Sequence, residues 1–222
     1  MRVDKMKTRQ YYEKEYHFDQ DASSPPDLRR AERILKYLGK DGDRLIDLGG
    51  GVGWMSMLAV KGGHVRESVN LDISMRALRF GRELQADSVF FACANGEALP
   101  LQTGSADRLL SFGSLEHFDD IDAGLKEIRR VLVPNGTAIL VVPNFYVRTE
   151  QPQEFRTHYW GWKRIMERNG FEVLTTGRDW GPQVFRNSSP GRALLRMAGR
   201  VASLFPYLQY QLIMVLKSKP CS

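Results

Sequence analysis

Residues 45–53 read LIDLGGGVG, and this stretch decides the fold. An apolar run containing one carboxylate, Asp47, leads into three glycines at alternate positions, Gly49, Gly51 and Gly53. A strand that runs into glycines and then into a helix brings bare backbone against a ligand, because no side chain stands in the way. The spacing is G-x-G-x-G, and a tryptophan stands where the dinucleotide pattern G-x-G-x-x-G has its third glycine. We therefore expect a ligand-binding loop at this point.

Outward from the loop, segments typical of strands and of helices alternate along the chain. We expect strands at 44–48, 68–71, 88–92, 107–112, 137–142, 171–176 and 207–216. We expect helices at 28–38, 54–60, 74–85, 121–132, 159–169 and 190–205. Strands separated by helices predict a parallel sheet with helices on both faces.

Composition excludes several classes of protein. Of the 222 residues 42% are hydrophobic, which suffices for a core, and the length favours a single domain over 1–222. Two distant cysteines and four histidines without metal-binding spacing predict neither a disulfide framework nor a metal site. The polar start MRVDKMKTRQ and the lack of a long apolar run predict a cytoplasmic protein without a signal peptide or membrane span.

The net charge of +6 is unevenly distributed. We expect three parts in the chain: an N-terminal lid with helices (1–42), a cofactor core (43–146), and a substrate-side segment that completes the sheet (147–222). The net charges of the first two parts are close to neutral. The third part holds 12 basic and 5 acidic residues, a difference of +7. Arginines recur every four residues within 190–205, at Arg192, Arg196 and Arg200. Such a stripe fits a helix packed on the domain with solvated arginines, a peripheral membrane contact, or a site for an anionic substrate. RNA is disfavoured, because no RNA-binding module accompanies the arginines.

Five further segments follow the glycine loop in a fixed order, and together they resemble a known family. Asp72 ends the second expected strand, 23 residues after Gly49. The segments NGEALP (95–100), SAD (105–107), SLEHF (114–118) and EIRRVLVPNG (127–136) come next, and NGF (169–171) follows later. This order resembles the class I S-adenosylmethionine-dependent methyltransferases, specifically their small-molecule branch, type 11. The resemblance implies a Rossmann-like, doubly wound, seven-stranded and mainly parallel sheet with an antiparallel final strand and an N-terminal helical lid.

The resemblance also assigns cofactor contacts, with S-adenosylmethionine as cofactor and S-adenosylhomocysteine as product. The alternate glycines would approach the methionine part, Asp72 the ribose hydroxyls, and Asn95 with Gly96 the adenine. Asn95 stands where the family usually has aspartate, and its amide oxygen can still accept a hydrogen bond from the adenine amino group. Three further residues complete the expected set: Asp47, Ile73 and Ser111.

Acceptor-side residues are expected near the ends of the fourth and fifth strands. His117 is the first candidate for a general base, because the ordinary pKa of histidine suits neutral pH, and His158 is the second. Structural roles remain alternatives for both. Four residues are expected at the substrate: Tyr16, His17, Tyr146 and Tyr159. PNFY (143–146) follows the fifth strand rather than the fourth and lacks paired prolines, so we do not interpret it as the motif of nucleic-acid amino-methyltransferases.

The sequence thus predicts a methyltransferase acting on a small or lipid-like molecule, and it does not choose among oxygen, nitrogen, sulfur and carbon acceptors. One alternative is a catalytically silent, cofactor-binding partner subunit. Another is a methyltransferase of a membrane-associated anionic lipid or glycan precursor. A nicotinamide oxidoreductase is disfavoured by the missing third glycine.

Overall fold

A computed structural model describes residues 5–14, 27–145, 154–178 and 211–219. Its strands are β1 (Gly42–Leu48), β2 (Val65–Asp72), β3 (Val89–Cys93), β4 (Ala106–Phe112), β5 (Leu132–Pro143), β6 (Phe171–Arg178) and β7 (Gln211–Ser218). Its helices are α1 (Lys5–Lys14), α3 (Leu28–Leu35), α4 (Trp54–Lys61), α5 (Met75–Glu83), α6 (Ile121–Val131) and α7 (Tyr159–Arg168), with short 3-10 helices η1 (Lys36–Leu38) and η2 (Leu115–His117).

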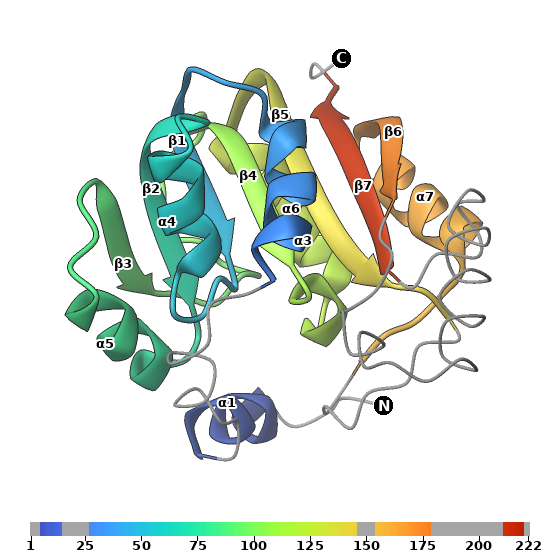
Figure 1. Ribbon diagram of the computed structural model, residues 1–222. Helices are drawn as coiled ribbons and strands as arrows, with labels where there is room; N and C mark the ends of the chain where they lie inside the picture. The colour runs from blue at the N-terminus through green and yellow to red at the C-terminus, as the bar shows by residue number, and fades with distance from the viewer. Residues whose placement is uncertain (1–4, 15–26, 146–153, 179–210, 220–222) are drawn as a thin grey trace, which may run out of the picture.

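Within the described residues, seven strands form one sheet in the order β3-β2-β1-β4-β5-β7-β6 (Figure 1). β1 lies between β2 and β4 and is parallel to both, so that Ile46 pairs with Val69 on one side and Leu109 on the other. β7 is antiparallel to both of its neighbours, β5 and β6. This arrangement confirms the expected doubly wound, mainly parallel sheet with an antiparallel final strand.

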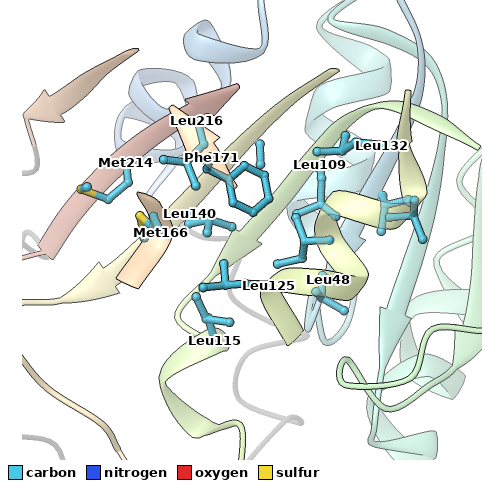
Figure 2. Close-up of a cluster of buried hydrophobic side chains, with 14 of the residues drawn as sticks. Leu48, Leu109, Leu115, Leu125, Leu132, Leu140, Met166, Phe171, Met214 and Leu216 are labelled. Carbon is cyan, nitrogen blue, oxygen red and sulfur yellow. The ribbon is translucent and has the colours of Figure 1, made fainter. Parts of the chain in front are cut away.

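Buried side chains cover both faces of the sheet. Leu109 belongs to the cluster that packs against α6 and α7, whereas its neighbour Leu110 belongs to the cluster under α3 and α4. Figure 2 shows the first cluster, in which Leu125 of α6 and Met166 of α7 meet side chains of the sheet. Strands buried on both faces carry nearly continuous apolar runs, as in AILVV at 138–142. Polar groups that act on a ligand are therefore expected at the strand ends.

The entry into β5 differs from the expectation. The fifth strand was expected to begin at residue 137, because residues 134–136 (PNG) are typical of a turn, but α6 ends at Val131 and β5 begins directly at Leu132. The register with β4 shifts here, and Asn135 has a φ of 66°. The turn residues are thus absorbed as an irregularity inside the strand, since asparagine tolerates a left-handed conformation.

α1 lies beyond the carboxyl ends of the parallel strands, close to α5 (Figure 1). The Glu13 carboxylate accepts hydrogen bonds from the backbone N–H groups of Met75 (2.8 Å) and Arg76 (3.3 Å). The Ser74 hydroxyl donates to the Tyr12 carbonyl at 3.2 Å. First-turn N–H groups have no partner within their own helix, so α1 caps α5 from outside.

The helix expected at 190–205 lies outside the described residues. No helix among the parts of the chain that the structure describes is long and apolar enough to cross a membrane.

Candidate cofactor site

A pocket lies at the carboxyl ends of β1, β2 and β4, where open α/β sheets bind ligands. Its walls come from the loop after β1, the end of β2, and the segments after β3 and β4, and Tyr12 of α1 also lines it. Five of the predicted cofactor residues line this pocket: Gly49, Asp72, Ile73, Asn95 and Gly96.

Gly49 is required by both conformation and space. Its φ is 70°, in the left-handed region, and a Cβ at this position would collide with the Ser114 hydroxyl. Its N–H donates to the Leu71 carbonyl at 2.7 Å, which ties the loop to β2. The loop therefore presents bare backbone at the point where β1, β2 and the segment after β4 meet.

Asp47 supports the glycine loop from beneath. It is fully buried, and its Oδ2 accepts hydrogen bonds from the Ser56 N–H (3.1 Å) and hydroxyl (2.9 Å). Burial raises the pKa of Asp47 to about 6, against the lowering effect of these hydrogen bonds. A Cβ on Gly50 would lie 2.6 Å from this carboxylate, so the backbone rests directly on it. Asp47 is not among the residues that line the pocket, and its hydrogen bonds to Ser56 tie the end of β1 to α4.

The other two alternate glycines have internal roles. The Gly51 N–H donates to Asp72 Oδ2 at 2.8 Å, and its carbonyl accepts from Asn70 Nδ2 at 2.8 Å. Gly53 has a φ of 88°, and a Cβ on it would lie 2.8 Å from the Phe91 ring. Neither is among the residues that line the pocket: Gly51 orients Asp72, and Gly53 makes room for Phe91.

Asp72 is half-buried in the pocket wall, and its orientation is fixed by backbone groups. Oδ1 accepts from the Ser74 N–H and Oδ2 from the Gly51 N–H, both at 2.8 Å. Burial raises its pKa, and the two N–H groups counteract that shift. Each carboxylate oxygen has a second lone pair, so the side chain can still accept from a ligand hydroxyl.

The segment after β3 forms the next part of the wall. The Asn95 amide oxygen accepts from the Glu97 N–H at 3.0 Å and closes a local turn, which leaves one lone pair of that oxygen for a ligand. A Cβ on Gly96 would collide with the Phe118 ring. Gly96 is therefore needed for the close approach of Phe118 to the backbone, and both residues line the pocket.

An ion pair on α6 holds the chain that follows this segment. Glu127 accepts from the Leu99 N–H at 2.7 Å, and Arg130 donates to the carbonyls of Leu99 (3.0 Å) and Leu101 (2.7 Å). Glu127 and Arg130 are joined at 2.7 Å. Their bond lowers the pKa of Glu127 and raises that of Arg130. The EIRR segment thus has a structural role behind the pocket.

The predicted acceptor-side residues are separated in the structure. His117 is 7% exposed and lines the pocket, with its ring centroid 5.8 Å from that of Tyr12. His158 is exposed and caps α7, its Nδ1 accepting from the Gly161 N–H at 3.1 Å, and it does not line the pocket. Tyr159 packs against the core cluster and Trp160 instead. The positions of His158 and Tyr159 therefore do not support the roles predicted for them.

Ser111 is buried within β4, 1% exposed and away from the pocket lining, so its predicted cofactor contact is not supported either. Three predicted substrate residues lie outside the described residues: Tyr16, His17 and Tyr146.

Sequence reasoning assigned no individual role to three residues that shape the site. Asn70 lies fully buried in β2 and holds the glycine loop, Ser114 meets Gly49, and Phe118 covers Gly96. A polar residue at a buried position of an apolar strand could have drawn attention to Asn70. The other two depend on contacts between distant segments, which spacing does not reveal.

The pocket wall combines three kinds of surface: bare backbone at Gly49, the Asp72 carboxylate, and the surfaces of Gly96 and Phe118. These surfaces suit the amino-acid, ribose and adenine parts of S-adenosylmethionine respectively. The residues present therefore fit the cofactor that the sequence resemblance implies.

Comparisons with known proteins agree with this geometry. Residues 46–140 match the family model described as a methyltransferase domain. Over 101 residues the chain is 36% identical to 2-methyl-6-phytyl-1,4-hydroquinone methyltransferase 2 of Oryza sativa subsp. japonica, covering 45% of this chain and 29% of that protein. Over 104 residues it is 35% identical to the malonyl-[acyl-carrier protein] O-methyltransferase of Methylococcus capsulatus, covering 46% and 38%.

A likeness among solved structures extends over nearly the whole chain. The [4+2]-cyclase SpnF superposes with a TM-score of 0.71, covering 96% of this chain and 94% of that one at 16% identity, which shows a shared fold. The chain spans less than two thirds of the length of the two curated relatives above. The matched region contains the glycine loop, Asp72, the 95–100 segment and the segment after β4. By this match and this geometry, residues 46–140 are similar to the methyltransferase domain of the class I S-adenosylmethionine-dependent methyltransferases.

Proposed function

We propose that this chain transfers the methyl group of S-adenosylmethionine to a small-molecule or lipid-like acceptor. The observation that carries the proposal is the single pocket joining Gly49, Asp72 and Gly96 at the carboxyl edge of the sheet. The two relatives named above, one for a phytylated hydroquinone and one for a carrier-bound malonyl group, support an acceptor of this class.

Bound S-adenosylmethionine supplies a methyl group on a sulfonium; the acceptor attacks it in line, and the electron pair of the broken C–S bond stays on sulfur as S-adenosylhomocysteine forms. The protein contributes mainly alignment. Asp72 would accept hydrogen bonds from the ribose hydroxyls, because the Gly51 and Ser74 N–H groups hold its carboxylate toward the pocket. Gly96 and Phe118 would bound the adenine end.

His117 is the proposed general base. It lines the pocket beside Ser114, and its ring packs edge-to-face with Tyr12. A hydroxyl acceptor would pass its proton to the imidazole as the new bond forms. An amine or an activated carbon acceptor would not need this transfer, and His117 would then only shape the pocket.

A calorimetric titration of the full chain with S-adenosylmethionine, S-adenosylhomocysteine and NAD tests the cofactor assignment. We expect both sulfur nucleotides to bind and NAD not to bind. Failure of folded protein to bind either sulfur nucleotide would overturn the proposal. Methyl transfer is then measured across phenols, quinols, carboxylic acids, amines and thiols. Binding without turnover on any of them would favour the silent partner subunit.

A further inference from the structure

A buried carboxyl group lies directly behind the pocket wall. Glu116 of η2 is 3% exposed, and its Oε2 has no hydrogen-bond partner among the residues that the structure describes. Its Oε1 lies 3.8 Å from the position that a Cβ would occupy on Gly113, which lines the pocket. Ser114 and His117, on either side of Glu116 in sequence, line the pocket as well. The carboxyl group of Glu116 therefore lies beside a pocket-lining glycine that has no side chain to shield it.

The surroundings of Glu116 favour a neutral carboxyl. α6 and β5 pack against η2 with apolar residues such as Leu125 and Val142. The segment at 154–158 lies over η2, where the Phe155 N–H donates to the Glu116 carbonyl at 2.8 Å.

The segment at 154–158 also brings a second carboxylate. The Glu154 side chain is 5% exposed, and its ion-pair partner Arg156 lies 4.0 Å away. On η2 itself the neighbouring titratable group is His117. Burial raises the pKa of Glu116 to about 8 against the lowering effect of a hydrogen bond from its own backbone N–H, and the charge of Glu154 adds to the increase. The group is thus mostly protonated at neutral pH.

We propose that Glu116 discriminates donor from product: its carboxyl releases its proton when a sulfonium occupies the pocket and takes one up again when the neutral thioether replaces it. This inference rests on the proposed function, because it takes S-adenosylmethionine as the ligand. A positive charge close to a buried acid stabilises its ionised form, whereas a neutral thioether does not. The proton released on donor binding passes to solvent, and one returns after methyl transfer. The donor would therefore bind more tightly than the product, which favours product release.

Proton release on binding tests the idea without an acceptor. The full chain is titrated at pH 7.5 with S-adenosylmethionine and with S-adenosylhomocysteine, each in phosphate and in Tris, whose different ionisation enthalpies reveal proton exchange. We expect the sulfonium ligand to release on the order of half a proton more than the thioether. The Glu116→Gln variant should bind both ligands without this difference, and its preference for the donor should fall several-fold. Glu172→Gln, an exposed carboxylate on β6, should behave as the wild type.

The outcomes separate the two proposals. If neither ligand binds folded wild-type protein, the proposed function fails and this inference fails with it. If both bind with equal proton exchange, the inference is overturned and the function stands. If Glu116→Gln does not fold, the wild-type protein alone can test the inference. The difference in proton release between the two ligands must vanish by about pH 10, because Glu116 is then ionised with either ligand bound. The His117→Asn variant must retain this difference in proton release. If the variant lost it, the released proton would come from the imidazole of His117 instead.

Discussion

Gly49 is restricted both by its left-handed backbone conformation and by its close contact with Ser114, and two variants can separate these effects. Gly49→Ala places a Cβ both in a left-handed conformation and against Ser114. We expect it to lose cofactor binding at least tenfold and to destabilise the fold by roughly 1–3 kcal/mol. Gly63→Ala is the matched control, since Gly63 has a φ of 66° but open space around its missing Cβ. Calorimetric titration and chemical denaturation give the two quantities, and equal effects on binding would show that contact with Ser114 does not matter.

Asp72 is the residue whose charge the cofactor should need most. Asp72→Asn keeps one oxygen for a backbone N–H but removes the ionised acceptor. Hydrogen bonds to charged groups contribute about 1.5–3 kcal/mol, so affinity for S-adenosylhomocysteine should fall roughly 10- to 100-fold. Asp43→Asn, an exposed carboxylate at the opposite end of β1, should leave affinity unchanged. Unchanged affinity in Asp72→Asn would remove the ribose contact from the proposed site.

Some residue roles were predictable from sequence and others were not. The loop itself and Asp72 followed from local order, since a strand, glycines, a helix and a strand-end carboxylate are neighbours in the chain. Gly53 was interpreted as a ligand contact, but its neighbour is Phe91, 38 residues later. His158 was interpreted as a possible catalyst, but its ring caps a helix. The surroundings of Gly53 depend on a residue that is distant in sequence, and those of His158 depend on a backbone N–H group. The spacing of residues in the sequence reveals neither contact.

The ion pair on α6 gives the fold a pH-dependent contribution to stability. Arg130 lowers the pKa of Glu127 in the folded state, so the unfolded chain takes up a proton first as the pH falls. The stabilisation is therefore complete above the ordinary glutamate pKa of about 4.3 and is lost as the pH falls through the lower, folded-state value. Glu127→Gln should destabilise by on the order of 1 kcal/mol at pH 7, discounted for partial exposure.

That difference between Glu127→Gln and wild type should shrink as the pH is lowered below 4. Denaturant titrations across pH 3–7 measure it, with Glu172→Gln as the exposed control. A difference independent of pH would mean that the loss comes from packing or from the Leu99 contact rather than from charge.

Elements were predicted better than their ends. Each strand that the structure describes appears where the alternation of apolar runs placed it, because a strand buried on both faces needs a continuous run of such residues. The start of β5 was wrong, since Pro134 and Asn135 read as a turn when judged locally. Pairing with β4 outweighs that local preference.

On the scale of the whole molecule, the basic excess after residue 146 makes membrane contact a testable proposal. Each arginine near an anionic surface contributes about 1 kcal/mol, so replacing Arg192, Arg196 and Arg200 by Gln should weaken retention on anionic vesicles about 100-fold at low salt. A triple variant of exposed cations elsewhere, Lys40→Gln, Lys61→Gln and Arg66→Gln, is the charge-matched control. Sedimentation with vesicles measures both. Equal losses would indicate a general charge effect, and no retention of wild type would end the proposal.

The position of β7 has a consequence for how the protein is made. β7 separates β5 from β6, although it follows both in the chain. During synthesis β6 leaves the ribosome with no neighbouring strand to join, and its edge stays open until residue 218 has emerged. The cofactor pocket, built from β1, β2 and β4, is complete in sequence long before that. A nascent chain stalled before β7 would thus present a nearly finished binding site beside an unfinished sheet.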